Sequence, residues 1–170
     1  LYREMQISRA TMNDVTCICI LQVCTKIGSL ELVKEVHFNI VSANYDSISA
    51  VVSTLVHAYG SCSSMIDGEE IFHELPDPSV VIWNTRIVGH AVGGDDIACS
   101  FVFKELQLMG LEPDDVTFLV LILVCNYSGL ISQGLSYLEC LRKEYGLIPN
   151  MKHYGIILNL LGCAGDFKRI

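Results

Sequence analysis

Apolar positions recur along this chain with a period close to 35 residues. Five marker positions set the period, and they are occupied by Gly28, Ser63, Gly94, Gly129 and Gly165. Successive markers lie 35, 31, 35 and 36 residues apart. Seven residues before each marker stands an apolar side chain, and these are Leu21, Val56, Ile87, Ile122 and Leu158. The constant register indicates a structural repeat, because unrelated loops would not keep it.

Each repeat is predicted to consist of two helices joined by a short turn. Helical spacing of apolar residues predicts first helices near 15–26, 51–60, 81–92, 116–127 and 151–162. Second helices are expected over 30–41, 65–75, 96–109 and 131–145. A hairpin of this size cannot bury its apolar face alone, so neighbouring hairpins have to stack. The sequence therefore predicts an all-α fold, an α-solenoid of helix-turn-helix repeats with an extended binding surface.

The composition fits a stacked core and argues against several other classes of protein. Of the 170 residues, 51% are hydrophobic and 18% are charged. The eight cysteines show no Cys-x-x-Cys spacing, so we expect them to be mostly buried and reduced rather than zinc ligands. No apolar run reaches the ~18 residues that span a bilayer. The sequence offers no nucleophile–base pair, metal cluster or phosphate loop. We therefore expect no enzymatic activity, cofactor, small-molecule substrate or membrane partner.

The net charge of −8 is unusual for a protein that binds nucleic acid, but the acids are unevenly distributed. None of the 19 acidic residues lies in the predicted first-helix windows, which contain Lys26, Arg86 and Lys152. The first helices are thus expected to form a mildly positive lining on an acidic protein. With only 11 lysines and arginines, tight sequence-independent binding is not expected.

The segment 80–114 resembles a pentatricopeptide repeat. It has an aromatic residue followed by asparagine at Trp83-Asn84, a mid-repeat glycine, and a closing Gly-x-x-Pro-Asp from Gly110 to Asp114. Its neighbours are similar to the long and short variants of a plant subclass that alternates three repeat lengths. The resemblance implies a partial repeat over 1–13, long repeats over 14–48 and 115–150, a short repeat over 49–79, a standard repeat over 80–114, and a partial short repeat over 151–170. It also implies a right-handed superhelix.

The family binds single-stranded RNA, one base per repeat, and the resemblance implies which residues contact the base. In the segment 80–114, Asn84 and Asp114 are the implied base-reading pair, with a preference for uracil, and Val81 and Val116 are the implied base sandwich. Less specific RNA-facing positions are Ser53 with Ser79, Leu119 with Asn150, and the cations Lys26 and Arg86. The aromatic residues Trp83, Phe118 and Tyr154 could stack on bases, but they share a slot that is expected to pack in the core.

The resemblance implies a role in organelle RNA metabolism, as site recognition for C-to-U editing or RNA processing. It implies location in a mitochondrion or chloroplast, single-stranded organellar RNA as partner, and editing-complex proteins as further partners. Residues 1–8 look like the second helix of an incomplete repeat, so we expect this chain to be a fragment. Two alternatives remain. One is a tetratricopeptide-like scaffold that binds protein through apolar groove positions such as Leu119, and the other is a degenerate array with weak RNA binding.

Overall fold

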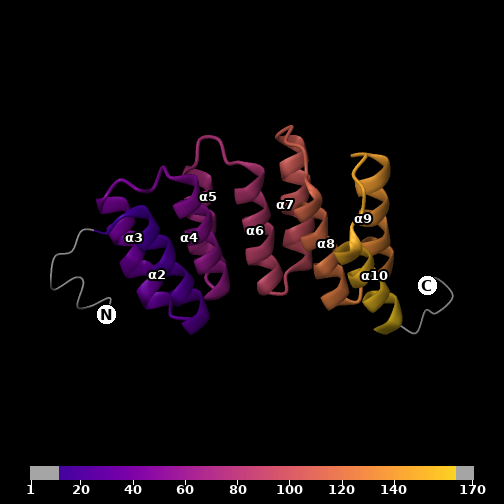
Figure 1. Cartoon of the computed structure of the whole chain (residues 1–170), viewed down its shortest axis with the longest axis horizontal. Helices are drawn as coiled ribbons and strands as arrows, with labels where there is room; N and C mark the ends of the chain where they lie inside the picture. The colour runs from indigo at the N-terminus through magenta and orange to yellow at the C-terminus, as the bar shows by residue number, and fades with distance from the viewer. Residues whose placement is uncertain (1–11, 164–170) are drawn as a thin grey trace. The chain divides into compact units, whose positions relative to one another are not determined.

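A computed structural model describes residues 12–163, and all regular structure in that range is α-helical. The helices shown in Figure 1 are α2 (Asp14–Ile27), α3 (Leu30–Ser42), α4 (Ser49–Ser61), α5 (Met65–Glu74), α6 (Val80–Val92), α7 (Asp96–Leu108), α8 (Asp115–Ser128), α9 (Ile131–Lys143) and α10 (Met151–Cys163). The helix expected over 1–8 lies outside the described residues. Every other predicted helix is confirmed, with its ends within two residues of the expected ones. The all-α prediction is therefore correct.

The described residues fall into two compact units that divide after Asp77. The first unit contains the hairpins α2–α3 and α4–α5, and the second contains α6–α7, α8–α9 and the single helix α10. Within each unit a first helix packs on its own second helix and on the first helix of the next hairpin, as α2 packs on α4 and α8 on α10. This is the stacking that the repeat predicted.

The core of the first unit is formed by the apolar stripes of α2, α3 and α4, to which α5 adds Ile71. Cys17 and Leu21 of α2 pack with Val36 of α3 and with Val52 and Leu55 of α4, and all five are buried. Burial of such side chains supplies the stabilisation that no single hairpin can supply.

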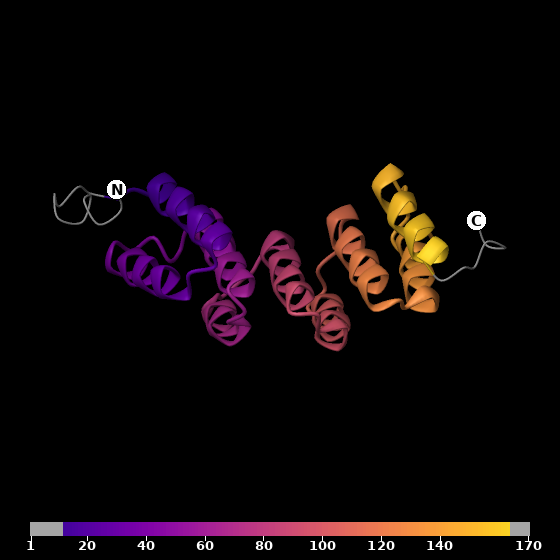
Figure 2. The same cartoon turned by 90° about the horizontal axis from the view of Figure 1, so that it is seen from below.

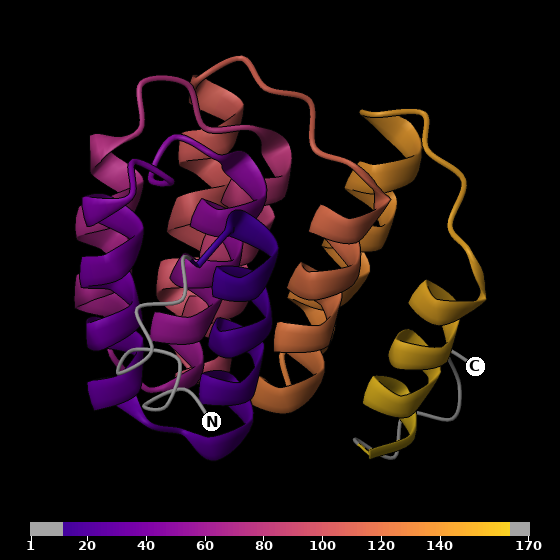
Figure 3. The ribbon, with the colours of Figure 1, turned by 60° about the vertical axis from the view of Figure 1, so that its left-hand side comes forward.

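The second unit is packed more through aromatic contacts. The rings of Phe103 and Phe118 meet edge to face with centroids 5.6 Å apart, and the Tyr145 ring lies 5.5 Å from that of Phe118. Gly134 of α9 is buried where a Cβ atom would lie only 2.8 Å from a methyl group of Leu160 in α10. Figure 2 shows the helices of this unit from below. Figure 3 shows the segment 144–150 running from α9 to α10.

The cysteines follow the packing. Four of them, Cys17, Cys24, Cys99 and Cys125, are buried as free thiols, whereas Cys19 and Cys163 are exposed. Burial, reinforced by nearby carboxylates, raises the pKa of Cys99 to about 12. Buried thiols of this kind are unreactive packing groups.

No helix within residues 12–163 combines the length and the apolar character that crossing a bilayer requires.

The turn inside each hairpin uses a left-handed backbone conformation at the marker position. Gly28, Gly94 and Gly129 have φ of 70°, 74° and 69°, and Ser63 adopts φ 58° in the same slot. The fifth marker, Gly165, lies outside the described residues. A side chain at positive φ is strained by contact with its own backbone, which costs roughly 1–2 kcal/mol. Ser63 therefore carries strain that the glycines avoid.

Replacing Ser63 with glycine should stabilise the protein. The expected gain in the free energy of unfolding is about 0.5–1 kcal/mol, because relief of the strain exceeds the greater entropy of glycine in the unfolded chain. Chemical denaturation measures it. Ser29→Gly is the matched control, since Ser29 has φ −96° and no side-chain cap hydrogen bond, and it should bring no gain. A Ser63→Gly variant no more stable than the wild type would contradict this account of the turn.

Candidate functional site

The side chain of Asn84 is held in a polar network at the junction of two repeats. It lies on α6 and is 6% exposed. Its Nδ2 donates a hydrogen bond to Oδ1 of Asp114 at 2.9 Å, and its Oδ1 accepts one from the hydroxyl of Thr117 at 2.6 Å. The two residues that the resemblance paired are thus in direct contact, although 30 positions separate them.

Asp114 joins this network because it caps α8. Its Oδ1 accepts the backbone N–H of Thr117 at 2.8 Å, and the Thr117 hydroxyl oxygen accepts the backbone N–H of Asp114 at 3.1 Å. This reciprocal arrangement is a capping box. Burial raises the pKa of Asp114, but the hydrogen bonds from Thr117 and Asn84 outweigh it and hold the pKa below its usual value. The carboxylate therefore stays ionised and accepts hydrogen bonds only.

Two aliphatic side chains stand exposed beside the network. Val81 on α6 is 60% exposed and Val116 on α8 is 45% exposed, and these two helices pack against each other. Both side chains are therefore within reach of a ligand. Their exposure makes them available for the predicted base contact, which remains a prediction.

The less specific positions do not form a second such network. Ser53, in the first unit, donates to the backbone oxygen of Ala50 at 3.2 Å. Ser79, in the second unit, is exposed and makes no side-chain cap hydrogen bond. Leu119 is half-buried on α8, whereas Asn150 caps α10 by accepting the backbone N–H of Lys152 at 3.0 Å. Leu119 has no polar side-chain atom with which to hold Asn150.

The cations show one departure from expectation. Lys26 and Lys152 are exposed, but Arg86 is only 6% exposed and is ion-paired to Glu105 of α7 at 2.7 Å. Its guanidinium also lies 5.4 Å from the centre of the Trp83 ring. Arg86 thus joins α6 to α7, and an RNA-facing role does not fit its position. The sequence did not predict the burial of Arg86, because helical periodicity does not show whether a cation at the edge of an apolar stripe has an acidic partner on another helix.

The aromatic positions split in a similar way. Trp83 and Phe118 are buried as predicted, but Tyr154 of α10 is 40% exposed, so its predicted core position is wrong. Phe118 is in contact with Phe103, which precedes it in the chain, and with Tyr145, which follows it. No helix follows α10 within residues 12–163 to cover Tyr154 in the same manner.

Two of the first helices also begin with an acidic residue, α2 with Asp14 and α8 with Asp115. Each acid lies one position before the helix window that was predicted to contain none.

Sequence reasoning gave no role to Thr117 and only a solvated or structural role to His153, and the two residues occupy the same position in α8 and α10. His153 is buried and its Nε2–H donates to the backbone oxygen of Asp115 at 2.9 Å, which leaves Nδ1 to accept the N–H of Asn150 at 3.2 Å. The signal for both was a capping residue three positions earlier, at Asp114 and Asn150. Such spacing predicts a helix start but does not reveal the contact with Asn84.

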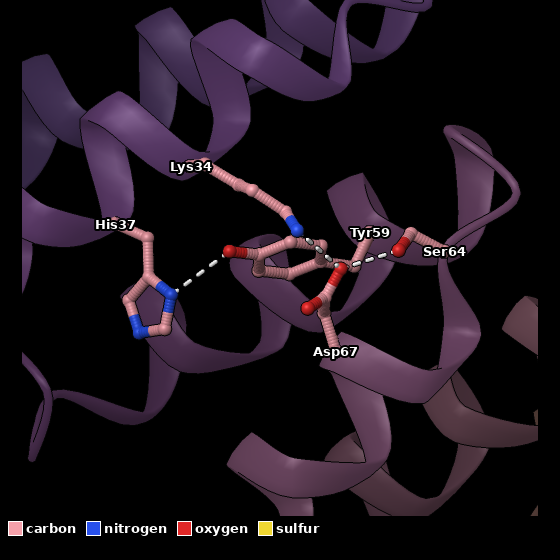
Figure 4. A network of polar contacts seen from close by, with 5 residues as sticks. All are labelled: Lys34, His37, Tyr59, Ser64 and Asp67. Carbon is pink, nitrogen blue, oxygen red and sulfur yellow. Dashed lines mark hydrogen bonds and ion pairs between the residues drawn. The ribbon is translucent and has the colours of Figure 1, made fainter.

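The first unit contains a separate polar network beside a hollow of about 400 Å³ between α3 and α5. Figure 4 shows His37 and Tyr59 pointing toward each other, with Nδ1 and the hydroxyl 2.9 Å apart. Lys34 and Ser64 converge on Asp67, the lysine at 3.2 Å. Burial, and then the nearby acids, raises the pKa of Tyr59 to about 12, so the phenol keeps its proton, and burial lowers the pKa of its hydrogen-bond partner His37. The network ties α3 to α4 and α5.

This network predicts that stability falls in mild acid. Burial lowers the pKa of His37, an effect that the carboxylates of Glu74, Asp67 and Asp46 oppose in part. The unfolded chain, with a histidine pKa of about 6.5, then binds a proton that the folded chain does not, so lowering the pH favours unfolding. The free energy of unfolding should fall between about pH 7.5 and about pH 5.5, above the range in which ordinary carboxylates titrate.

Denaturant titrations across this pH range provide the measurement. His37→Gln should show a shallower fall than the wild type, whereas His57→Gln, at an exposed position of α4, should keep the wild-type slope. Equal slopes in all three proteins would show that His37 does not carry the pH dependence.

A second hollow, of about 520 Å³, lies between α8 and α10. Its lining is mostly apolar, from Leu119, Leu123 and Ile156, with Lys152 at its edge. The amides of Asn126 and Asn159 are hydrogen-bonded to each other at 3.2 Å in the same place. Within residues 12–163, no group of three or more histidine, cysteine or acidic residues is arranged to hold a metal ion.

Comparison with known proteins agrees with this architecture. No family model matches the chain. A pentatricopeptide repeat-containing protein of Arabidopsis thaliana, At4g30700, is 34% identical over 99% of this chain, which spans 21% of that protein. Another from the same plant, ELI1, named chloroplastic, is 32% identical over 92% of the chain and 25% of its own length.

Solved structures show the same fold. One is the crystal structure of the pentatricopeptide repeat protein PPR10 in complex with an 18-nt psaJ RNA element, which matches with a TM-score of 0.85 at 21% identity. The match covers 99% of this chain and 25% of the PPR10 chain. The structure of PPR10 from maize matches 98% of the chain and 24% of its own, with a TM-score of 0.74 at 18% identity. The chain belongs to the pentatricopeptide repeat family, and it spans about a quarter or less of the length of these relatives.

Proposed function

We propose that this chain binds single-stranded RNA and that the repeat 80–114 reads one base through Asn84 and Asp114. The observation that carries the proposal is the hydrogen bond of 2.9 Å between these two side chains, next to the exposed Val81 and Val116. The relatives are pentatricopeptide repeat proteins, and PPR10 has been solved with RNA, which supports the same partner for this chain.

The chemistry of Asn84 suits a pyrimidine edge. After its bonds to Asp114 and Thr117, the amide retains one N–H donor and one lone pair on Oδ1. A base presents its own donor and acceptor side by side on its Watson–Crick edge, and uracil offers an N–H flanked by carbonyl oxygens. The valines would cover the two faces of the base and exclude water, which strengthens the hydrogen bonds inside. A uracil at this register is therefore the proposed ligand.

The broader role proposed is organellar. We propose the repeat boundaries 14–48, 49–79, 80–114 and 115–150, and site recognition for C-to-U editing or RNA processing in a mitochondrion or chloroplast. A relative named chloroplastic supports this placement. Any catalytic step would be supplied outside this chain, by another part of the protein or by editing-complex proteins. Recovery of organellar transcripts crosslinked to the full-length protein tests the role, and recovery of cytosolic messages alone would oppose it.

The hollow between α8 and α10 favours a second candidate, the binding of a protein segment. Leu119, Leu123 and Ile156 give it an apolar surface that an apolar side chain of a peptide can cover. If the chain failed to bind any single-stranded RNA and instead bound an apolar peptide at Leu119, this scaffold function would replace the first.

Loss of the amide of Asn84 should remove base preference at one register. In fluorescence anisotropy titrations with oligonucleotides that carry uracil or cytosine at a single position, the wild type should favour uracil. Asn84→Ala should lose about two- to tenfold in affinity for the uracil RNA, the worth of one hydrogen bond, and little for the cytosine RNA. Asn126→Ala, which removes another amide from a first helix, should keep the preference. Equal binding of both RNAs by the wild type at every register would rule out base reading.

A further inference from the structure

We propose that Thr117, a residue of the next repeat, is a positioning residue that fixes the amide of Asn84 and so sets its base preference. This inference rests on the proposed RNA-reading function. Thr117 is fully buried, so it acts through Asn84 and not by touching the base itself.

The hydrogen-bond directions allow one arrangement. The Thr117 oxygen accepts the backbone N–H of Asp114 at 3.1 Å, so its hydroxyl hydrogen remains to be donated. The two acceptors in reach are Oδ1 of Asn84 at 2.6 Å and Oδ1 of Asp114 at 2.9 Å, and the closer is Asn84. The ionised Asp114 can only accept, and it takes the Nδ2 hydrogen of Asn84. Both contacts therefore hold the amide with its nitrogen toward Asp114 and its oxygen toward Thr117.

Amide orientation decides which base is preferred. A side-chain amide presents a donor on one side and an acceptor on the other, and a half-turn exchanges them. Uracil and cytosine differ by the same exchange. Uracil has a donor at N3 and an acceptor on C4, whereas cytosine has an acceptor at N3 and a donor on C4. An amide free to turn would accommodate either base, whereas a fixed amide favours one. Turning Asn84 over would also place its oxygen against the carboxylate of Asp114, which is repulsive.

The other junctions lack this arrangement. The position of Thr117, third in a first helix, is occupied elsewhere by Thr16, Val51, Ile82 and His153. Thr16 donates to Asn13 at 2.7 Å as part of a helix cap. His153 accepts the backbone N–H of Asn150 and donates to the backbone oxygen of Asp115, and the residue corresponding to Asn84 there is Leu119, which has no amide to orient. The set of amide, carboxylate and hydroxyl occurs at one of these junctions within residues 12–163.

The experiment removes the hydroxyl and restores it. Thr117→Val has nearly the same shape without the hydroxyl, and Thr117→Ser keeps the hydroxyl without the methyl group. Affinities for the uracil and cytosine oligonucleotides are measured for both at a temperature where circular dichroism shows them folded. We expect the ratio of affinities to fall at least about threefold in Thr117→Val, through loss of one hydrogen bond, and to stay near the wild-type ratio in Thr117→Ser. Thr16→Val, which removes a capping hydroxyl in the first unit, should leave the ratio unchanged.

The outcomes separate this inference from the function it rests on. A wild type with no base preference at any register overturns both. A wild type with a preference that Thr117→Val retains overturns the role of Thr117 while base reading stands.

A second measurement covers the case in which Thr117→Val does not fold. The ¹⁵N relaxation of the Asn84 side-chain amide in the RNA-free wild type should then show restricted motion, comparable to rigid backbone with an order parameter of about 0.85. A value below about 0.6 would show an amide that is free to turn and would overturn the inference.

Discussion

The contact of Asn84 with Asp114 and Thr117 is the interaction on which the candidate site depends. It joins a first helix, the closing residue of its repeat and the start of the next repeat. The capping box that starts α8 also places the carboxylate and hydroxyl that hold the amide. The same few bonds therefore fix a helix boundary and a recognition group, and neither can change without affecting the other.

The packing of the hairpins makes this contact possible. Since α6 packs on α7 and on α8, the first turn of α8 comes beside the first turn of α6. Phe103, Phe118 and Tyr145 pack together in the same unit, and the ion pair of Arg86 with Glu105 joins α6 to α7. These contacts leave Val81 and Val116 in solvent, where a ligand can reach them.

Much of the architecture could be predicted from the sequence because it depends on apolar period and turn chemistry. The helices and the left-handed turns repeat in every hairpin, so each copy reinforces the signal of the others. Side-chain partners are not repeated in that way. The burial of Arg86 depends on Glu105, 19 residues away, and the exposure of Tyr154 depends on which helices pack against α10. The role of Thr117 depends on Asn84, 33 residues earlier, and a helix-capping pattern alone cannot show it.

The central claim is that the surface around Asn84 contacts RNA, and chemical-shift mapping tests it most directly. The ¹⁵N-labelled chain is titrated with a single-stranded oligouridine and the resonances of the side-chain amide of Asn84 are followed together with the backbone amides of Val81 and Val116. The account predicts that these resonances shift first and most, with smaller changes in α7. Shifts confined to second helices such as α7 and α9, with none at Asn84, would contradict it.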